Sequence, residues 1–105
     1  MQVEYTWQVR TELTEIRDYI AKDNPAAAKK VVTSIESEIE LLGYFPWYGR
    51  KTDQTGVMAR TLSRYPHIVF YRVEIVLDTL VVLHVLHGAR RHPGFQEDAA
   101  EFVHA

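Results

Sequence analysis

The stretch Asp23-Asn24-Pro25-Ala26-Ala27-Ala28 decides the fold, because it ends one helical pattern and begins another. Asparagine caps helices through its side-chain oxygen, and proline suits the first helical position, where no backbone N–H is needed. Apolar residues recur at helical spacing on both sides of this stretch. The two stripes are Val9, Leu13, Ile16 and Ile20 before it, and Ala28, Val31, Val32, Ile35, Ile39 and Leu42 after it. Two amphipathic helices with so short a connection are predicted to form an antiparallel hairpin.

Strand-like segments flank the predicted hairpin on both sides. Upstream, Val3 and Tyr5 alternate with polar residues, and Thr6 is suited to cap the first helix. Downstream, Gly43 is expected to end the second helix, and a loop over 44–56 follows it. Three further strand-like segments cover residues 57–64, 68–73 and 80–87. The predicted fold class is α+β, in the order β-α-α-β-β-β, with the helix hairpin packed on a small, mainly antiparallel sheet.

The last predicted strand is apolar on both faces between Leu80 and Leu86. A helix hairpin covers only one face of a sheet, so the other face needs a cover. The C-terminal tail, a second copy of the chain or a partner chain would each supply one. This pattern predicts a protein that works by being bound.

Length and composition fit one globular domain, since the chain has 105 residues, of which 47% are hydrophobic and 25% charged. We place this domain at residues 1–92 and a C-terminal tail at residues 93–105. Within the tail, Phe95, Ala99 and Phe102 have the spacing of a short helix.

The sequence also limits the chemistry and the compartment. It contains no cysteine, so disulfides, thiol catalysis and cysteine zinc sites are excluded. The N-terminus has no basic segment followed by an apolar one, and the longest apolar run is far shorter than the roughly 20 residues that span a bilayer. We therefore expect a cytoplasmic protein without membrane contact.

Charge is unevenly distributed along the chain. Residues 49–92 carry seven Lys and Arg against three Asp and Glu, whereas residues 1–48 and 93–105 are both acidic. A basic block between acidic ends predicts an anionic partner for that block. Small domains also show such asymmetry by chance, and charge alone does not choose between the two explanations.

Candidate functional residues gather at the end of the last predicted strand, in the segment HVLHGARRH at residues 84–92. Arg90 and Arg91 suit a phosphate or carboxylate, and His87 can shuttle a proton. The alternative is a solvated strand end. His84 and His87 are three residues apart on a strand and point to opposite faces, so no metal site is expected.

Other conspicuous side chains lie earlier in the sequence. Arg60 and Arg72, on adjacent predicted strands, are expected to face one side and to form a basic groove with Arg90, unless they only keep the sheet soluble. Trp7 and Trp47-Tyr48 are expected to fill core positions rather than to bind a partner. The sequence has no nucleotide-binding glycine motif and no nucleophile motif, and no cofactor is expected.

Five motifs, taken in order, resemble the ParE/RelE toxin superfamily and its ParE branch most closely. They are Asp23–Ala28, Gly49-Arg50, Arg60 with Leu62, the segment 68–73 (IVFYRV) and the segment 82–90 (VLHVLHGAR). Each motif alone is weak, but the ordered set is fairly specific. The resemblance covers roughly residues 3–92.

The resemblance implies a toxin that a cognate, ParD-like antitoxin holds inactive in a hetero-oligomeric complex. A disordered part of such an antitoxin folds on the toxin and would cover its apolar surface. ParE-like toxins inhibit DNA gyrase and arrest growth, without direct sequence-specific binding to nucleic acid, whereas RelE-like toxins cut messenger RNA on the ribosome. Expected antitoxin contacts are Leu13, Ile16, Ile20, Leu80 and Val82, and expected target contacts are Arg60, Arg72, Arg90, Arg91 and Phe95.

The two branches make different chemical demands. RNA cleavage needs a proton acceptor, a proton donor and cations on the phosphate, for which His87, Arg90 and His92 are the candidates. Several RNA-cleaving relatives carry a titrating tyrosine just past the last strand, where this chain has Phe95. No carboxylate lies within residues 57–65, where one subgroup places a base. We therefore expect a gyrase inhibitor that is not itself a catalyst, with RNA cleavage as the alternative.

Overall fold

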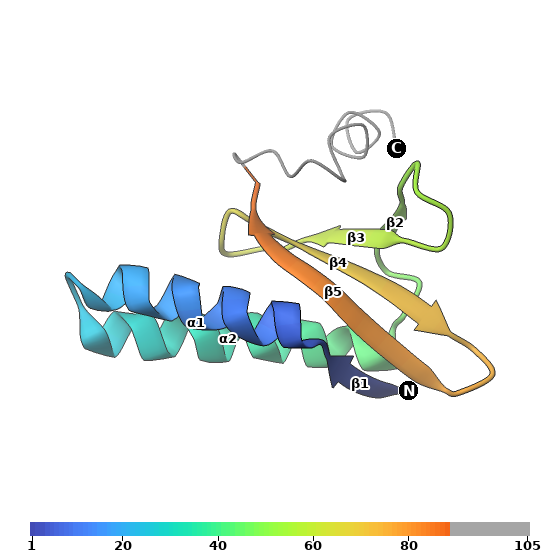
Figure 1. The fold of residues 1–105 in the computed structure, drawn as a ribbon, viewed down its shortest axis with the longest axis horizontal. Coiled ribbons are helices and arrows are strands. Elements are labelled where there is room, and N and C mark those ends of the chain that lie inside the picture. Colours follow the sequence, from blue (N-terminus) through green and yellow to red (C-terminus); the bar gives the residue numbers. More distant parts are fainter. Residues whose placement is uncertain (89–105) are drawn as a thin grey trace.

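In a computed structural model, which describes residues 1–88, two helices pack against one face of a five-stranded sheet (Figure 1). The elements are β1 (Gln2–Tyr5), α1 (Trp7–Ala21), α2 (Pro25–Tyr44), β2 (Arg50–Lys51), β3 (Met58–Thr61), β4 (His67–Glu74) and β5 (Thr79–His87). The strand order is β1-β5-β4-β3-β2, with β1 parallel to β5 and the other pairs antiparallel. The predicted α+β class is confirmed, with the helix hairpin on a mainly antiparallel sheet.

The helix hairpin forms at the predicted junction. The hydroxyl of Thr6 accepts a hydrogen bond from the backbone N–H of Val9 and caps α1. The side-chain oxygen of Asn24 accepts from the N–H of Ala27 at 3.1 Å, and Pro25 is the first residue of α2. Within residues 1–88, neither helix has the length and apolarity needed to cross a membrane.

Gly43 does not end the second helix, contrary to the expectation from sequence. The helix continues through Tyr44, and Phe45 caps it, with its N–H bonded to the carbonyl of Leu41. Gly43 is buried, and a Cβ there would lie 2.8 Å from the carbonyl oxygen of Met1. The glycine is therefore needed for the close approach of the chain's first residues to α2, not for a helix stop.

The sheet has one strand more than the sequence predicted. Arg50 and Lys51 form the short edge strand β2, which pairs with Ala59 and Met58 of β3, inside the segment that we expected to be a loop. Two residues are too few to give an alternating pattern in the sequence. Both residues are cationic, and charged side chains on an edge strand discourage pairing with another chain.

The main core lies between the helices and the sheet. It joins residues of both helices to residues of β3, β4 and β5 and of the turn after β3: Val9, Leu13, Ile35, Ile39, Leu42, Met58, Leu62, Val69, Tyr71, Leu80, Val82 and Val85. A smaller cluster lies on the other face, where Ala59 and Phe70 are buried and Val57, Ile68 and Leu86 pack against them. The sheet is therefore apolar on both faces, as the sequence predicted.

A buried carboxylate joins α1 to the central strand. Glu12 is only 6% exposed, and it accepts a hydrogen bond from the backbone N–H of Val85 at 2.8 Å. Its other oxygen lies 2.8 Å from Nδ1 of His84 and accepts from the side-chain amide of Gln8 at 3.2 Å. Strand β1 pairs with β5 only as far as Val82, so Glu12 takes the place of a neighbouring strand beyond that point.

A buried hydroxyl shapes the connection between α2 and β2. The hydroxyl of Tyr71 donates to the carbonyl of Pro46 at 2.8 Å and accepts from the N–H of Gly49 at 3.0 Å. Burial raises the pKa of Tyr71, so the hydroxyl keeps the proton that it donates. A Cβ on Gly49 would lie 2.5 Å from this hydroxyl, so the turn requires glycine.

Glu12→Ala is expected to lower the free energy of unfolding by about 2 kcal/mol, because it leaves the N–H of Val85 buried without an acceptor. Glu12→Gln keeps an acceptor oxygen and is expected to cost less than Glu12→Ala. Urea unfolding of the purified variants measures the difference, with the exposed Glu15→Ala as control. Equal stability of Glu12→Ala and Glu15→Ala would contradict a structural role for this carboxylate.

Tyr71→Phe is expected to lower the free energy of unfolding by about 1–2 kcal/mol, since two backbone groups lose their hydrogen-bond partner. The phenyl ring keeps its packing, so the loss reports the hydroxyl alone. Thermal or urea unfolding measures it, and Tyr19→Phe, at a site 70% exposed, serves as control. A Tyr71→Phe variant as stable as the control would mean that the hydroxyl does not hold this turn.

Candidate functional site

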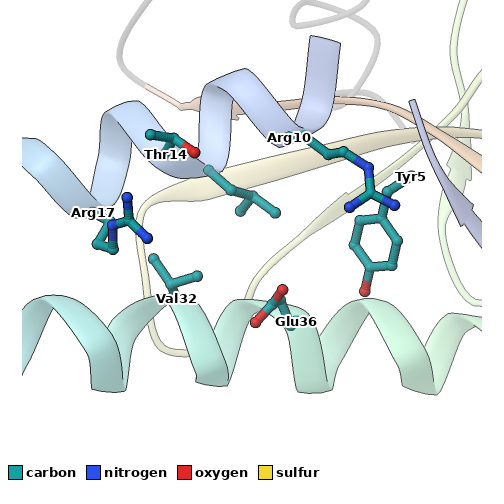
Figure 2. A pocket seen from close by; sticks show the side chains of 7 residues that line it. Tyr5, Arg10, Thr14, Arg17, Val32 and Glu36 are labelled. Carbon is teal, nitrogen blue, oxygen red and sulfur yellow. The ribbon is translucent and has the colours of Figure 1, made fainter. Parts of the chain in front are cut away.

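A cleft of about 380 Å³ opens between the two helices. It is lined by Tyr5, Arg10, Leu13, Thr14, Arg17, Val32 and Glu36. Figure 2 shows the guanidinium groups of Arg10 and Arg17 extending from α1 into the space above α2, where Glu36 and Val32 lie. The two arginines are seven residues apart, so they project from the same face of α1.

The residues that line this cleft include two arginines and one carboxylate. The guanidinium carbon of Arg10 lies 6.0 Å from the ring centre of Tyr5. The hydroxyl of Tyr5 donates to Glu40 at 2.8 Å, and burial together with this carboxylate raises the pKa of Tyr5. Arg17 forms a solvent-exposed ion pair with Asp18 at 3.5 Å. The floor of the cleft is apolar, and its lining includes two arginines but only one carboxylate, that of Glu36. The cleft therefore suits a segment that carries both apolar and acidic side chains.

The predicted antitoxin contacts divide into accessible and inaccessible groups. Ile16 and Ile20 are half-buried on α1, and Leu13 lines the cleft although only 7% of it is exposed. Leu80 and Val82 are fully buried beneath the helices. Their side chains alternate with that of Val81 along β5 and face the core under the helices, so in this conformation they offer a partner no surface.

Arg60 and Arg72 do not face the same side of the sheet, which corrects our expectation of a shared basic groove. Arg60 pairs with Val69, a core residue on the helix side, so it projects to that side. Arg72 alternates with Tyr71 along β4 and projects to the opposite side, where it forms an ion pair with Glu74. The two arginines therefore cannot hold one phosphate together.

The histidines of β5 have separate surroundings. His84 contacts Glu12, as described above, and so belongs to the structural link between α1 and β5. His87 lies opposite His67 of β4, and the two rings meet edge to face with centres 5.5 Å apart. In residues 1–88, no group of three or more acidic and histidine side chains is placed to hold a metal ion. Four predicted functional residues, Arg90, Arg91, His92 and Phe95, lie outside the described residues.

Exposed aromatic residues are the feature that the sequence patterns did not predict. Trp47 and Tyr48, expected in the core, are 61% and 63% exposed, and Trp7 is 82% exposed. Tyr44 and Phe45 are exposed beside them, so four aromatic rings occur within five residues. The sequence did contain a signal, because the Pro46 and Gly49 that bracket Trp47-Tyr48 are typical of a surface turn.

Comparison with known proteins identifies the family. Residues 3–92 match the family model described as the ParE toxin of the type II toxin-antitoxin system parDE. Toxin RelE2 of Caulobacter vibrioides is 31% identical over 90 residues, which cover 85% of this chain and 97% of that protein. The Sinorhizobium fredii protein Y4kP is 31% identical over 83 residues, covering 79% of this chain and 86% of Y4kP.

The fold agrees with this assignment. A solved structure titled as the chromosomal ParDE toxin-antitoxin system from P. aeruginosa superposes with a TM-score of 0.73 at 26% identity. The alignment covers 83% of this chain and 95% of that chain. By sequence and by fold, over nearly its whole length, this chain belongs to the ParE toxin family of type II toxin-antitoxin systems.

Proposed function

We propose that this toxin arrests growth by inhibiting DNA gyrase and that a cognate ParD-like antitoxin neutralises it by binding along the helix hairpin. The antitoxin half of the proposal is supported by the P. aeruginosa neighbour, whose title names a ParDE system, and by the cleft between α1 and α2. The gyrase half is supported by the ParE family match and, within residues 1–88, by the placement of Arg60 and Arg72 on opposite faces of the sheet.

The cleft suits an antitoxin segment for two reasons. Its floor contains Leu13 and Val32, which would bury apolar side chains, and its rim carries Arg10 and Arg17, which would pair with carboxylates. A disordered segment that is partly acidic and partly apolar gains enough from both to offset the entropy lost in ordering it. Ile16 and Ile20 extend the same contact along α1.

Within residues 1–88, the arrangement of the candidate cations and of His84 is the observation that favours gyrase over RNA. Cleavage of RNA needs cations and proton-transfer groups that converge on one phosphate. Here Arg60 and Arg72 project from opposite faces of the sheet, and the ring of His84 contacts Glu12. A protein-directed inhibitor has no need for such convergence.

RNA cleavage on the ribosome is the second candidate function. The relative from Caulobacter vibrioides is named RelE2, and His67 and His87 lie together on the same face at one end of the β4–β5 pair. In this alternative His87 would take or give a proton, and Arg90 and His92 are the other candidate residues of the sequence. The two candidates are separable by experiment because they act on different macromolecules.

Arg10→Glu combined with Arg17→Glu is expected to weaken antitoxin binding about tenfold or more, because two favourable charge contacts at the cleft become repulsive. Isothermal titration or surface plasmon resonance with the cognate antitoxin measures the change. Arg64→Glu, an exposed cation that does not line the cleft, is the matched control. An unchanged affinity in the cleft variant would place the antitoxin on another surface.

Purified toxin is expected to inhibit supercoiling by DNA gyrase and to leave messenger RNA intact on ribosomes. Both assays are run with wild-type toxin, with toxin preincubated with antitoxin, and with His87→Ala. Inhibition of gyrase that antitoxin relieves and that His87→Ala leaves unchanged is the expected result. Cleavage of ribosome-bound messenger RNA that His87→Ala abolishes would replace the gyrase proposal by the RNA-cleaving alternative.

A further inference from the structure

The loop between α2 and β2 is held from inside the protein. The buried hydroxyl of Tyr71 bonds to Pro46 and to Gly49, the two residues on either side of Trp47 and Tyr48. The N–H of Tyr48 also donates to the carbonyl of Phe45 at 3.0 Å, which tightens the turn. We call residues 44–49, which run from the last residue of α2 to the start of β2 in Figure 1, the aromatic loop. Its backbone is held close to the core, while Trp47 and Tyr48 are carried outward between the two hydrogen-bonded positions.

The exposed aromatic surface of this loop is large for so small a domain. Tyr44, Phe45, Trp47 and Tyr48 are 80%, 59%, 61% and 63% exposed. Aromatic side chains have areas of about 200 Å² each, so the four rings expose on the order of 500 Å². The largest apolar patch on a typical monomer is roughly 300–600 Å² and is often functional. One short segment therefore exposes as much aromatic area as a typical binding patch.

The turn itself does not require these rings. Pro46 and Gly49 accept and donate the hydrogen bonds that hold the loop, and both do so through backbone atoms. Trp47 and Tyr48 are absent from both apolar clusters of the described residues. Small polar residues would serve at these two positions of a surface turn. The rings are thus better explained by a partner than by folding.

Cations border the aromatic loop. The guanidinium of Arg60 lies over the ring of Tyr48, 4.0 Å from its centre, so this cation is already oriented toward the loop. Arg50 and Lys51 follow the loop directly as strand β2. Tryptophan, tyrosine and arginine are the residues that most often dominate the energetics of protein–protein interfaces.

A protein partner fits this surface better than a nucleic acid. Aromatic rings with arginines can also stack on bases, but such sites follow a phosphate backbone with a continuous basic groove. Here the preceding turns of α2 carry Glu36, Glu38 and Glu40, and Glu40 lies one helical turn before Tyr44. These carboxylates would repel a polyanion, whereas a protein surface can present carboxylates to the cations and apolar groups to the rings.

We propose that the aromatic loop docks on the toxin's target protein, with Trp47 and Tyr48 inserted in an apolar groove whose rim carries carboxylates facing Arg60 and Lys51. This inference rests on the proposed function only in taking the target to be a protein. The loop shares no residue with the lining of the cleft between the helices, so target and antitoxin would use different surfaces. Tyr71 acts as a positioning residue, because it holds the loop without reaching its outer side.

The test compares Trp47→Ala combined with Tyr48→Ala against Tyr19→Ala, which removes a ring 70% exposed on α1 that does not line the cleft. Three quantities are measured: growth arrest after induced expression, capture of purified DNA gyrase by the tagged toxin, and affinity for the antitoxin. The loop variant is expected to lose growth arrest and to capture gyrase about tenfold less, with antitoxin affinity within twofold of wild type. The Tyr19→Ala control is expected to match wild type in all three.

A loop variant that arrests growth like wild type overturns the inference. Antitoxin affinity within twofold of wild type shows in addition that the loop variant is folded. A loop variant that loses antitoxin affinity while circular dichroism shows it folded also overturns it, because the loop would then be an antitoxin surface. In a Trp7→Phe variant, whose only tryptophan is Trp47, quenching of the fluorescence by a single-stranded oligonucleotide would replace the protein partner by a nucleic acid. If wild-type toxin arrests growth without capturing gyrase, the gyrase proposal fails, and growth arrest by the loop variant still decides the role of the loop.

Discussion

The hydrogen bond between the carboxylate of Glu12 and the backbone of Val85 holds the two layers of this protein in register. Strand β1 ends at Tyr5, yet the central strand β5 continues to His87. Beyond Val82 the edge of β5 would leave backbone groups without partners, and a buried polar group without a partner is costly. Glu12 of α1 supplies an acceptor at this edge of β5. The hydrogen bond forms only if α1 crosses β5 at one position. The core under the helices, and with it the cleft between α1 and α2, follows from that position.

Two buried polar groups therefore organise two different parts of the molecule. Glu12 bonds the helix hairpin, which carries the cleft proposed for the antitoxin, to β5, and Tyr71 holds the path of the aromatic loop. Both are polar atoms with satisfied hydrogen bonds within a mainly apolar core, the arrangement that specifies a single structure rather than a merely compact one. Having the cleft and the loop on separate elements would let an antitoxin bind before or after the target is engaged. Neutralisation would then depend on steric exclusion by the whole antitoxin rather than on competition for one patch.

The local parts of the fold could be read from the sequence, whereas contacts between distant residues could not. Asn24-Pro25 and the apolar stripes predict the hairpin because capping and helical periodicity act within a few residues. In the sequence Glu12 looks like one more solvated carboxylate, since its acceptor role depends on Val85, 73 residues away. The faces of Arg60 and Arg72 were misjudged for the same reason, because they depend on the register of β3 against β4. Tryptophan and tyrosine are buried more often than they are exposed, and the prediction that placed Trp47 and Tyr48 in the core relied on this average.

The parallel pairing of β1 with β5 has a consequence for folding during synthesis. Gln2 pairs with Thr79 and Tyr5 with Val82. Strand β1 therefore cannot pair until β5, which lies almost at the end of the described residues, has been synthesised. Pairings so distant in sequence are slow to form, because the intervening chain must first be brought together. During translation the helix hairpin leaves the ribosome without the strand that completes its core. The core of the nascent toxin is thus incomplete until β5 has been synthesised, and the complete fold forms only after that point.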